Sequence, residues 1–187
     1  MVSIAEACAE PDHPAEIAVV ISDVADAAGL VRAASMGLAT EVVAPEDYAD
    51  RSGFEDRLVE VLRAHGAEAV CLAGFMRLLA GGFLSAFPDR VLNIHPSLLP
   101  AFPGLNVQQK AIDHGVRFSG CTVHFVTEEM DAGPIVLQAA VPIEPDDDAA
   151  ALAARILAEE HRIYPEAVRL LAEGRLRIEG RAVRILE

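Results

Sequence analysis

Short apolar runs alternate with amphipathic segments along most of the chain. Six of these runs have the length and the composition of buried strands, and they lie at 16–22, 40–44, 67–74, 90–95, 119–126 and 133–143. Segments 28–37 and 51–66 show helical spacing and end in glycine, which is favoured just past the end of a helix. This order predicts an α/β fold with a doubly wound, mainly parallel sheet that binds ligands at the carboxyl ends of its strands. The later strands follow one another through turns, so we expect them to pair antiparallel.

The C-terminal region adds a long helix and a hairpin to this pattern. The helix is expected from Asp147 to Ala172, with a bend or a break near Pro165, because proline removes a helical hydrogen bond. Two short apolar runs on either side of Glu179 and Gly180 predict a terminal β-hairpin. Chains of about 100–200 residues usually form one domain, so we expect residues 1–187 to form a single domain.

The composition excludes several classes of protein. With 52% hydrophobic and 24% charged residues it is that of an ordinary globular protein. No apolar run approaches the roughly 20 residues that span a bilayer, and the N-terminus lacks a targeting pattern, so we expect a cytoplasmic protein with no membrane partner. Cys8, Cys71 and Cys121 are far apart and outside any CxxC, which favours reduced core thiols over disulfides or zinc ligands. The net charge of -14 argues against a nucleic-acid partner but not against a small anion.

Polar residues end the fourth apolar run, in the stretch NIHPSLLPAFPG. Asn93 and His95 fall on one face of their strand, because side chains alternate along a strand. Pro96 favours an extended His95 and ends sheet pairing, which predicts a stiff loop at the carboxyl end of the strand. An amide N–H and a protonated imidazole can both donate to an oxygen that gains negative charge, so the pair suits carbonyl chemistry. A core histidine beside an ordinary stiff loop remains an alternative on the pattern alone.

Three further residues are candidates for the same site. Asp131, in an Asp-Ala-Gly-Pro turn, is a carboxylate that could set the protonation of the pair, or else a solvated turn residue. His124 by itself is more often a satisfied core histidine than a catalyst. Glu160 interrupts an apolar helical stripe and therefore needs a partner or a ligand, unless it lies at the solvated edge of the helix. The histidines show no HxH or HExxH spacing, so no metal site is expected.

Four segments together resemble the phosphoribosylglycinamide formyltransferases, a family that uses 10-formyltetrahydrofolate. They are FMRLL at 75–79, NIHPSLLPAFPGL at 93–105, GCTVHFVTEEMDAGPIVLQ at 120–138 and EHRIYP at 160–165. The resemblance implies a formyltransferase-like fold and formyl transfer from 10-formyltetrahydrofolate to the amine of glycinamide ribonucleotide in purine biosynthesis. The partners it implies are these two small molecules, with no metal and no covalent enzyme intermediate.

The resemblance also implies roles for individual residues. Asn93, His95 and Asp131 become the catalytic trio. The walls that hold the pterin match Phe75, Met76, Arg77, Leu78, Leu79, Thr127, Glu128, Glu129 and Met130. Residues that match family positions near the substrates are Arg51, His124 and Glu160.

The sequence departs from the family at its start and after Leu105. Family members often carry a histidine-containing tract where this chain reads NVQQKAI, so no catalytic role is assigned there. Family members also open with a strand and a Gly-Ser-Asn loop that holds the substrate phosphate, whereas this chain matches the family from the following helix. We therefore expect Met1 to be an internal methionine, with about 10–15 further residues upstream, enough for one strand and a loop. A homodimer is another arrangement that would cover the sheet edge.

Other functions remain open at this stage. A 10-formyltetrahydrofolate hydrolase would use water in place of the amine, although hydrolase relatives usually carry a regulatory domain. Transfer to methionyl-tRNA would normally require a further RNA-binding domain. A catalytically idle folate-binding protein is the alternative from a different functional class, and the retained Asn93, His95 and Asp131 argue against it.

Overall fold

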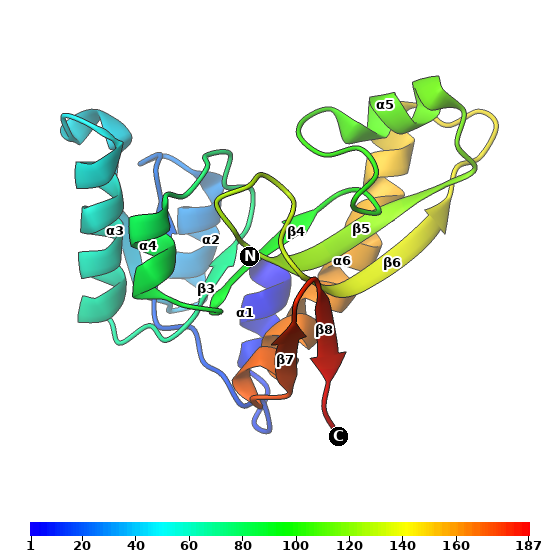
Figure 1. Ribbon diagram of the computed structural model, residues 1–187. Helices are drawn as coiled ribbons and strands as arrows, with labels where there is room; N and C mark the ends of the chain where they lie inside the picture. The colour runs from blue at the N-terminus through cyan, green and yellow to red at the C-terminus, as the bar shows by residue number, and fades with distance from the viewer.

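The structure, a computed structural model that describes residues 1–187, has its strands in two separate sheets. A small parallel sheet pairs β1 (Val20–Ser22) with β2 (Thr40–Val42). The second sheet has the order β3-β4-β5-β6-β8-β7. Its strands are β3 (Val70–Leu72), β4 (Val91–His95), β5 (Phe118–Phe125), β6 (Ile135–Pro142), β7 (Leu176–Glu179) and β8 (Ala182–Ile185). Figure 1 shows β5 and β6 as the long strands that extend from the middle of the molecule towards α5.

Helices connect and cover these strands. They are α1 (Val2–Cys8), α2 (Ala28–Ser35), α3 (Arg51–Ala64), α4 (Gly81–Ala86), α5 (Val107–His114) and α6 (Ala149–Ala172), with a 3-10 turn at Pro45–Asp47. In Figure 1, α3 and α4 lie at one end of the molecule, and α1 lies beside α6 near the middle. None of the helices combines the length and the hydropathy needed to cross a bilayer.

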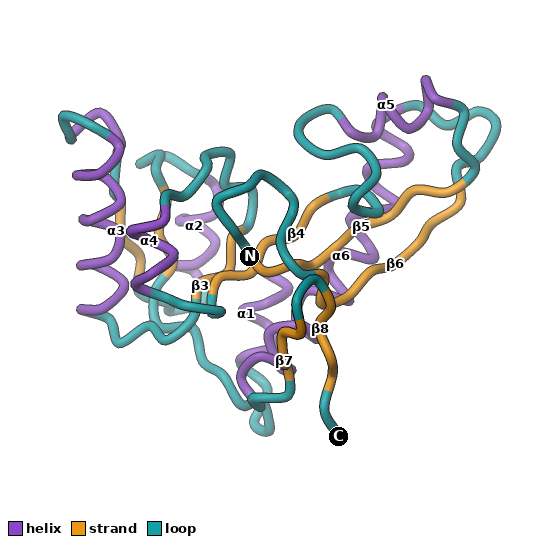
Figure 2. The backbone as a smooth tube through the Cα atoms, in the orientation of Figure 1, coloured by secondary structure: helices purple, strands orange, loops and turns teal.

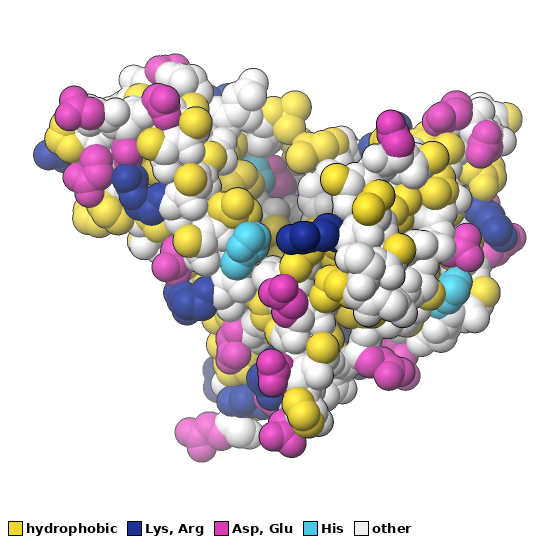
Figure 3. All heavy atoms as spheres, turned by 180° about the vertical axis from the view of Figure 1, so that it is seen from behind, with side chains coloured by type: hydrophobic (Ala, Val, Ile, Leu, Met, Phe, Trp, Pro, Cys, Tyr) yellow, Lys and Arg dark blue, Asp and Glu magenta, His cyan; other side chains and the backbone are white.

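Two apolar cores fill the interior. The first lies between α6, α1 and strands β4 to β6, and its fully buried members include Leu92, Val123 and Leu152. The second lies around α3 and α4 and includes Phe54 and Phe83. Acidic side chains are spread over the face shown in Figure 3, in keeping with the net charge of -14. Strand β3 packs against both cores, because Cys71 contacts the first core and Val70 and Leu72 contact the second.

The predicted fold class is confirmed, with parallel pairs β1–β2 and β3–β4 and antiparallel pairs β4–β5 and β5–β6 among the later strands. The terminal hairpin is also found, as β7 and β8 with the turn at Gly180 and Arg181. The first three strands are only three residues long, although their apolar runs span five to eight residues. Helices α4 and α5 were not expected from the sequence pattern.

Of the two alternatives predicted near Pro165, a break is wrong, because α6 continues from Ala149 to Ala172 with Pro165 inside it, and a bend stays a prediction. The ring removes one backbone hydrogen bond, but buried side chains on both sides of it, including Tyr164 and Val168, anchor the helix to the sheet. The free energy gained by burying these side chains outweighs the cost of the lost hydrogen bond. All three cysteines are free, and Cys121 is completely buried.

Candidate active site

Four polar side chains lie on one face where β4 and β5 pair. Asn93 is opposite His124 and His95 is opposite Thr122 in the antiparallel register. The other face of β4 presents Leu92 and Ile94 to the first core. The alternation predicted for β4 is therefore present, and the pairing with β5 brings His124 beside Asn93.

His95 is almost fully buried, with 6% of its surface exposed, and both of its ring nitrogens face acceptors. Nε2 lies 3.0 Å from the carbonyl oxygen of Phe102 and must donate, since a carbonyl only accepts. Nδ1 lies 3.5 Å from Oδ2 of Asp131. An imidazole with acceptors on both sides is best satisfied when it carries both protons, so this geometry suits the imidazolium form.

Asp131 is held in an uncommon backbone conformation at the tip of its turn. Its φ is 52°, in the left-handed region that aspartate tolerates better than most residues. Its Oδ2 accepts the backbone N–H of Gly104 at 2.8 Å, which ties the turn to the loop after β4. Two positions later, a Cβ on Gly133 would lie 1.8 Å from the carbonyl oxygen of Phe125, so only glycine fits there. The Asp-Ala-Gly-Pro sequence thus fixes the carboxylate next to His95.

His124 orients the amide of Asn93. Nδ1 of His124 faces the carbonyl oxygen of Phe125 at 2.9 Å and must donate to it. In the neutral ring Nε2 then accepts from Nδ2 of Asn93, 3.2 Å away. Burial lowers the pKa of His124, which favours the neutral ring that this arrangement needs. The amide NH₂ of Asn93 is thereby fixed, and its second N–H remains available as a donor.

The proline-rich loop after β4 is anchored by hydrogen bonds to β5 and β6. Thr122 Oγ1 donates to the carbonyl of Ser97 at 2.7 Å and accepts the N–H of Leu99 at 3.0 Å. Gln138 Nε2 donates both to Thr122 Oγ1 and to the carbonyl of Leu99. Ser97 Oγ donates to the carbonyl of Phe102, the same group that accepts from His95. Figure 2 shows this segment as an irregular loop between β4 and α5, and the Leu99–Pro100 peptide within it is cis.

Arg51 lies in a separate cavity of about 400 Å³ that it shares with Arg77 of the predicted pterin segment. Its Nε donates to the buried carboxylate of Glu55 at 2.7 Å. Both oxygens of Glu55 also accept the backbone N–H of Ala80, at 3.0 and 3.1 Å. Glu55 thus connects α3 to the end of segment 75–79, and the sequence pattern did not single it out.

The two predicted pterin walls differ in how they expose their side chains. Phe75 packs against the second core and Leu79 is buried in it, whereas Met76 and Leu78 are exposed. The loop Thr127–Met130 lies between β5 and β6, where Thr127 Oγ1 donates to the carbonyl of Glu129. A Cβ on Gly81 would lie 2.3 Å from Oε1 of Glu128, so the carboxylate of Glu128 reaches the start of α4. The second wall therefore touches the helix that follows the first.

Glu160 is not brought into contact with the trio. It is half-buried on α6 and has no hydrogen-bond partner, and burial raises its pKa. The positive amino group of Met1 opposes the effect of burial and lowers the pKa of Glu160. No cluster of three or more His, Cys, Asp or Glu side chains is arranged to hold a metal ion.

The sequence and the structure of the chain are similar to those of known formyltransferases. The Formyl transferase profile matches residues 1–168. A phosphoribosylglycinamide formyltransferase from Haemophilus influenzae is 43% identical over 177 residues, which is 95% of this chain and 84% of that protein. The crystal structure of glycinamide ribonucleotide transformylase 1 from Symbiobacterium toebii aligns with a TM-score of 0.97 at 58% identity, over 99% of this chain and 87% of that chain.

Two other comparisons concern the length and the reaction. The trifunctional purine biosynthetic protein adenosine-3 of Bos taurus is 45% identical over 169 residues, 90% of this chain but 17% of that protein. The chain thus spans about one sixth of the length of such curated relatives. A formyltetrahydrofolate deformylase from Pseudomonas syringae is more distant, with 27% identity and a TM-score of 0.84 over 94% of this chain and 58% of that one.

Proposed function

The chain belongs to the formyl transferase family, and from that premise we propose that it transfers a formyl group from 10-formyltetrahydrofolate to the amine of glycinamide ribonucleotide. This reaction belongs to purine biosynthesis. The observation that supports the proposal most is the imidazole of His95, buried with acceptors on both nitrogens, one of them the carboxylate of Asp131. An imidazolium beside an available amide N–H suits the oxyanion that forms when an amine adds to a formyl carbon.

The proposed chemistry has two stages. The amine of the ribonucleotide attacks the formyl carbon, and the carbonyl oxygen becomes an oxyanion that accepts from Asn93 Nδ2 and from the His95 imidazolium. The 3.5 Å between Nδ1 of His95 and Asp131 exceeds an ordinary hydrogen bond, so this N–H is the one that is left to donate to the oxyanion. The attacking nitrogen then loses a proton, the folate nitrogen gains one, and the bond between that nitrogen and the formyl carbon breaks. Asp131 balances the charge on His95 throughout.

Binding of the two substrates is assigned to the surrounding segments. The pterin lies between segment 75–79 and the loop Thr127–Met130, largely against backbone groups. The guanidinium of Arg51, beside Arg77, suits an anionic group of a substrate. Glu160, as a carboxylate without a protein partner, suits a polar group of the ribonucleotide.

Turnover of 10-formyltetrahydrofolate with and without glycinamide ribonucleotide tests the proposal. We expect tetrahydrofolate to form only when the ribonucleotide is present, together with formylated ribonucleotide. Release of formate without the ribonucleotide would assign the chain to the hydrolase class, for which the likeness to the Pseudomonas syringae deformylase is the supporting observation. Folate binding without turnover would make it an idle binder. Asp146→Asn, at an exposed position without hydrogen bonds, is a suitable control beside Asn93→Ala.

A further inference from the structure

The backbone of Phe102 has a conformation that its own sequence disfavours. Its φ is 52°, in the left-handed region, where a bulky side chain is rare. The next residue is Pro103, which favours an extended backbone at the residue before it. The other non-glycine residues with positive φ are Asp89, Asn106 and Asp131, of types that tolerate this region. Backbone strain persists only where the surrounding structure holds it, so tertiary contacts must hold Phe102.

The carbonyl of Phe102 is the group that this conformation directs at the candidate active site. It accepts the Nε2–H of His95 at 3.0 Å. The O–H of Ser97 lies 3.1 Å from the same carbonyl oxygen but 2.6 Å from that of Ala101, so His95 is the main donor to Phe102. With Nε2 bound in this way, Nδ1 is the nitrogen that faces Asp131. The carbonyl of Phe102 therefore sets which ring nitrogen of His95 is left to donate to a substrate.

The ring of Phe102 is held on two sides. On one side is α5, where the ring of His114 lies edge-on, with 5.6 Å between the ring centroids and 76° between the ring planes. On the other side the ring packs against the first core, which contains the completely buried Ala111 of the same helix. Figure 1 shows the loop between β4 and α5 folded back towards α5. The ring of Phe102 thus fixes this loop to the helix that follows it.

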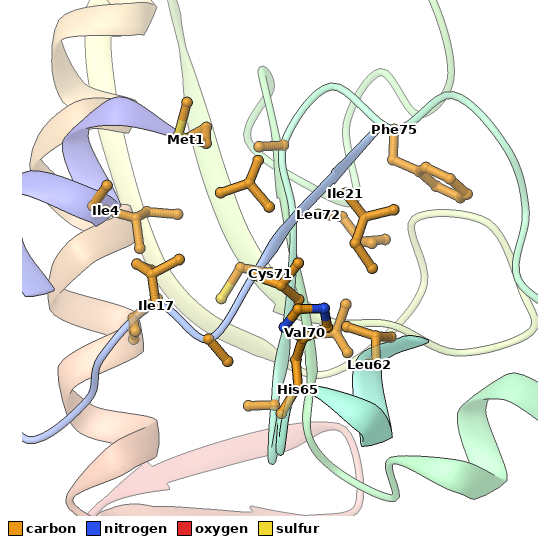
Figure 4. Close-up of a pocket in the computed structure, with 18 of the residues that line it drawn as sticks. Met1, Ile4, Ile17, Ile21, Leu62, His65, Val70, Cys71, Leu72 and Phe75 are labelled. Carbon is orange, nitrogen blue, oxygen red and sulfur yellow. The ribbon is translucent and has the colours of Figure 1, made fainter. Parts of the chain in front are cut away.

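A large cavity elsewhere in the molecule does not border this loop. It has a volume of about 1020 Å³ and lies between β1 and β3, where Figure 4 shows Ile17, Cys71 and Leu72 among the residues of its walls. No residue from 91 to 167 lines it. A substitution of Phe102 therefore acts on the loop and on its contacts with α5, and it leaves this cavity unchanged.

We propose that Phe102 is a positioning residue for His95. Its ring, clamped between His114 and the first core, holds the left-handed backbone, and this backbone aims the carbonyl at Nε2 of the imidazole. Helix α5, in a stretch to which the sequence assigned no catalytic role, thereby acts on the site through one aromatic ring. The effect on catalysis rests on the proposed function, in which Nδ1–H of His95 donates to the oxyanion, whereas the position of the imidazole does not.

Exchange of the Nε2 proton of His95 with water tests the clamp without any substrate. It is measured by NMR on protein with isotope-labelled histidine, and His95→Gln assigns the signal. We expect exchange at least about tenfold faster in Phe102→Ala than in the wild type, and wild-type exchange in Phe102→Tyr, which keeps the ring. Phe118→Ala is the matched control, because this phenyl group is 62% exposed at the start of β5. Unchanged exchange in Phe102→Ala would overturn the proposal.

Phe102→Asn separates the backbone conformation from the volume of the ring. Asparagine and alanine both remove the ring, but asparagine tolerates positive φ, so Phe102→Asn should exchange at least about threefold more slowly than Phe102→Ala. Equal exchange in these two variants would contradict the proposal, because the ring would then only fill space. His114→Ala weakens the clamp from its exposed side while Phe102 stays in place, and it should also speed exchange. If Phe102→Ala does not fold, wild-type exchange in His114→Ala overturns the clamp.

Steady-state kinetics measures the effect on catalysis. We expect kcat of Phe102→Ala to fall by about tenfold or more, with KM for both substrates within about threefold of wild type and with recovery in Phe102→Tyr. Faster exchange of the Nε2 proton with an unchanged kcat would overturn the positioning role. If the wild type transfers no formyl group, the proposed function fails, and the exchange measurements still decide whether the ring of Phe102 positions His95.

Discussion

Oδ2 of Asp131 lies 3.5 Å from Nδ1 of His95 and accepts the N–H of Gly104 through the same oxygen. One carboxylate oxygen therefore sets the position of the loop after β4 and faces the imidazole that the loop surrounds. Its second oxygen lies 4.0 Å from Nε2 of His124. The two histidines and the aspartate form one electrostatic unit.

Asp131→Asn tests the charge of this unit. The amide can still accept from Gly104, but it cannot balance an imidazolium, so we expect kcat to fall by about 10²–10⁴ with little change in KM. Steady-state kinetics across pH would show the loss, and Asp146→Asn should behave as wild type. A loss of less than about threefold would remove Asp131 from the catalytic role.

His124 predicts a dependence of stability on pH. Burial lowers its pKa below the ordinary 6.5, so below that pH the unfolded chain binds the proton more readily than the folded chain. The contribution of neutral His124 to the stability of the fold is complete above about pH 6.5. It is lost as the pH falls towards the lowered pKa of His124 in the folded chain. His124→Gln keeps an acceptor for Asn93 but does not titrate, so its loss of Tm between pH 7 and 5 should be smaller.

The control for this measurement is His161→Gln, at an exposed position of α6. It should leave the pH profile of Tm unchanged. Parallel profiles for wild type and His124→Gln would show that His124 is not the titrating group.

Glu55→Gln tests the connection between α3 and segment 75–79. The substitution leaves one neutral acceptor where two carboxylate oxygens hold the N–H of Ala80 and the guanidinium of Arg51. We expect a loss of about 1–3 kcal/mol in the free energy of unfolding and a higher KM for formyl folate, with kcat nearly unchanged. Glu60→Gln, on the exposed side of α3, is the matched control. An unchanged KM would limit Glu55 to stability alone.

Glu160→Gln is expected to separate stability from function. Burial raises the pKa of Glu160 above the ordinary 4.5, so its contribution to stability is present below that pH and is lost as pH rises through the raised value. The variant should therefore have a higher Tm than wild type near pH 8, and no higher Tm near pH 4.

The same variant, Glu160→Gln, tests binding of the ribonucleotide. If the carboxylate contacts the ribonucleotide, KM for that substrate should rise by about tenfold or more. An unchanged KM would remove Glu160 from the binding site.

The sequence predicted the parts of the site that depend on strand alternation. Asn93 and His95 share a face because they are two residues apart on β4, and that face carries the polar site while Leu92 packs in the core. The roles of Asp131 and Glu160 came from the family resemblance, since neither their turn nor their helical stripe distinguishes a ligand from solvent.

Backbone partners could not be predicted in the same way. The carbonyl of Phe102 and the N–H of Gly104 orient the site, but every residue carries such groups and only the folded loop selects these two. Glu55 looked like an ordinary helical ion-pair residue, because its second partner, Ala80, is 25 positions away. A break at Pro165 was one of two alternatives, and it does not occur because local propensity leaves out the burial of the residues around the proline.

The hydrogen bonds among Ser97, Thr122 and Gln138 hold the candidate active site together within one continuous segment of the chain. The side-chain hydrogen bonds that orient Asn93, His95 and Asp131, and those of the loop around them, have both partners within residues 93–138. Chimaeras that exchange residues 1–87 with those of a relative should therefore keep the formyl chemistry. Under the proposed function, such exchanges would alter which substrates bind while the arrangement of Asn93, His95 and Asp131 stays the same.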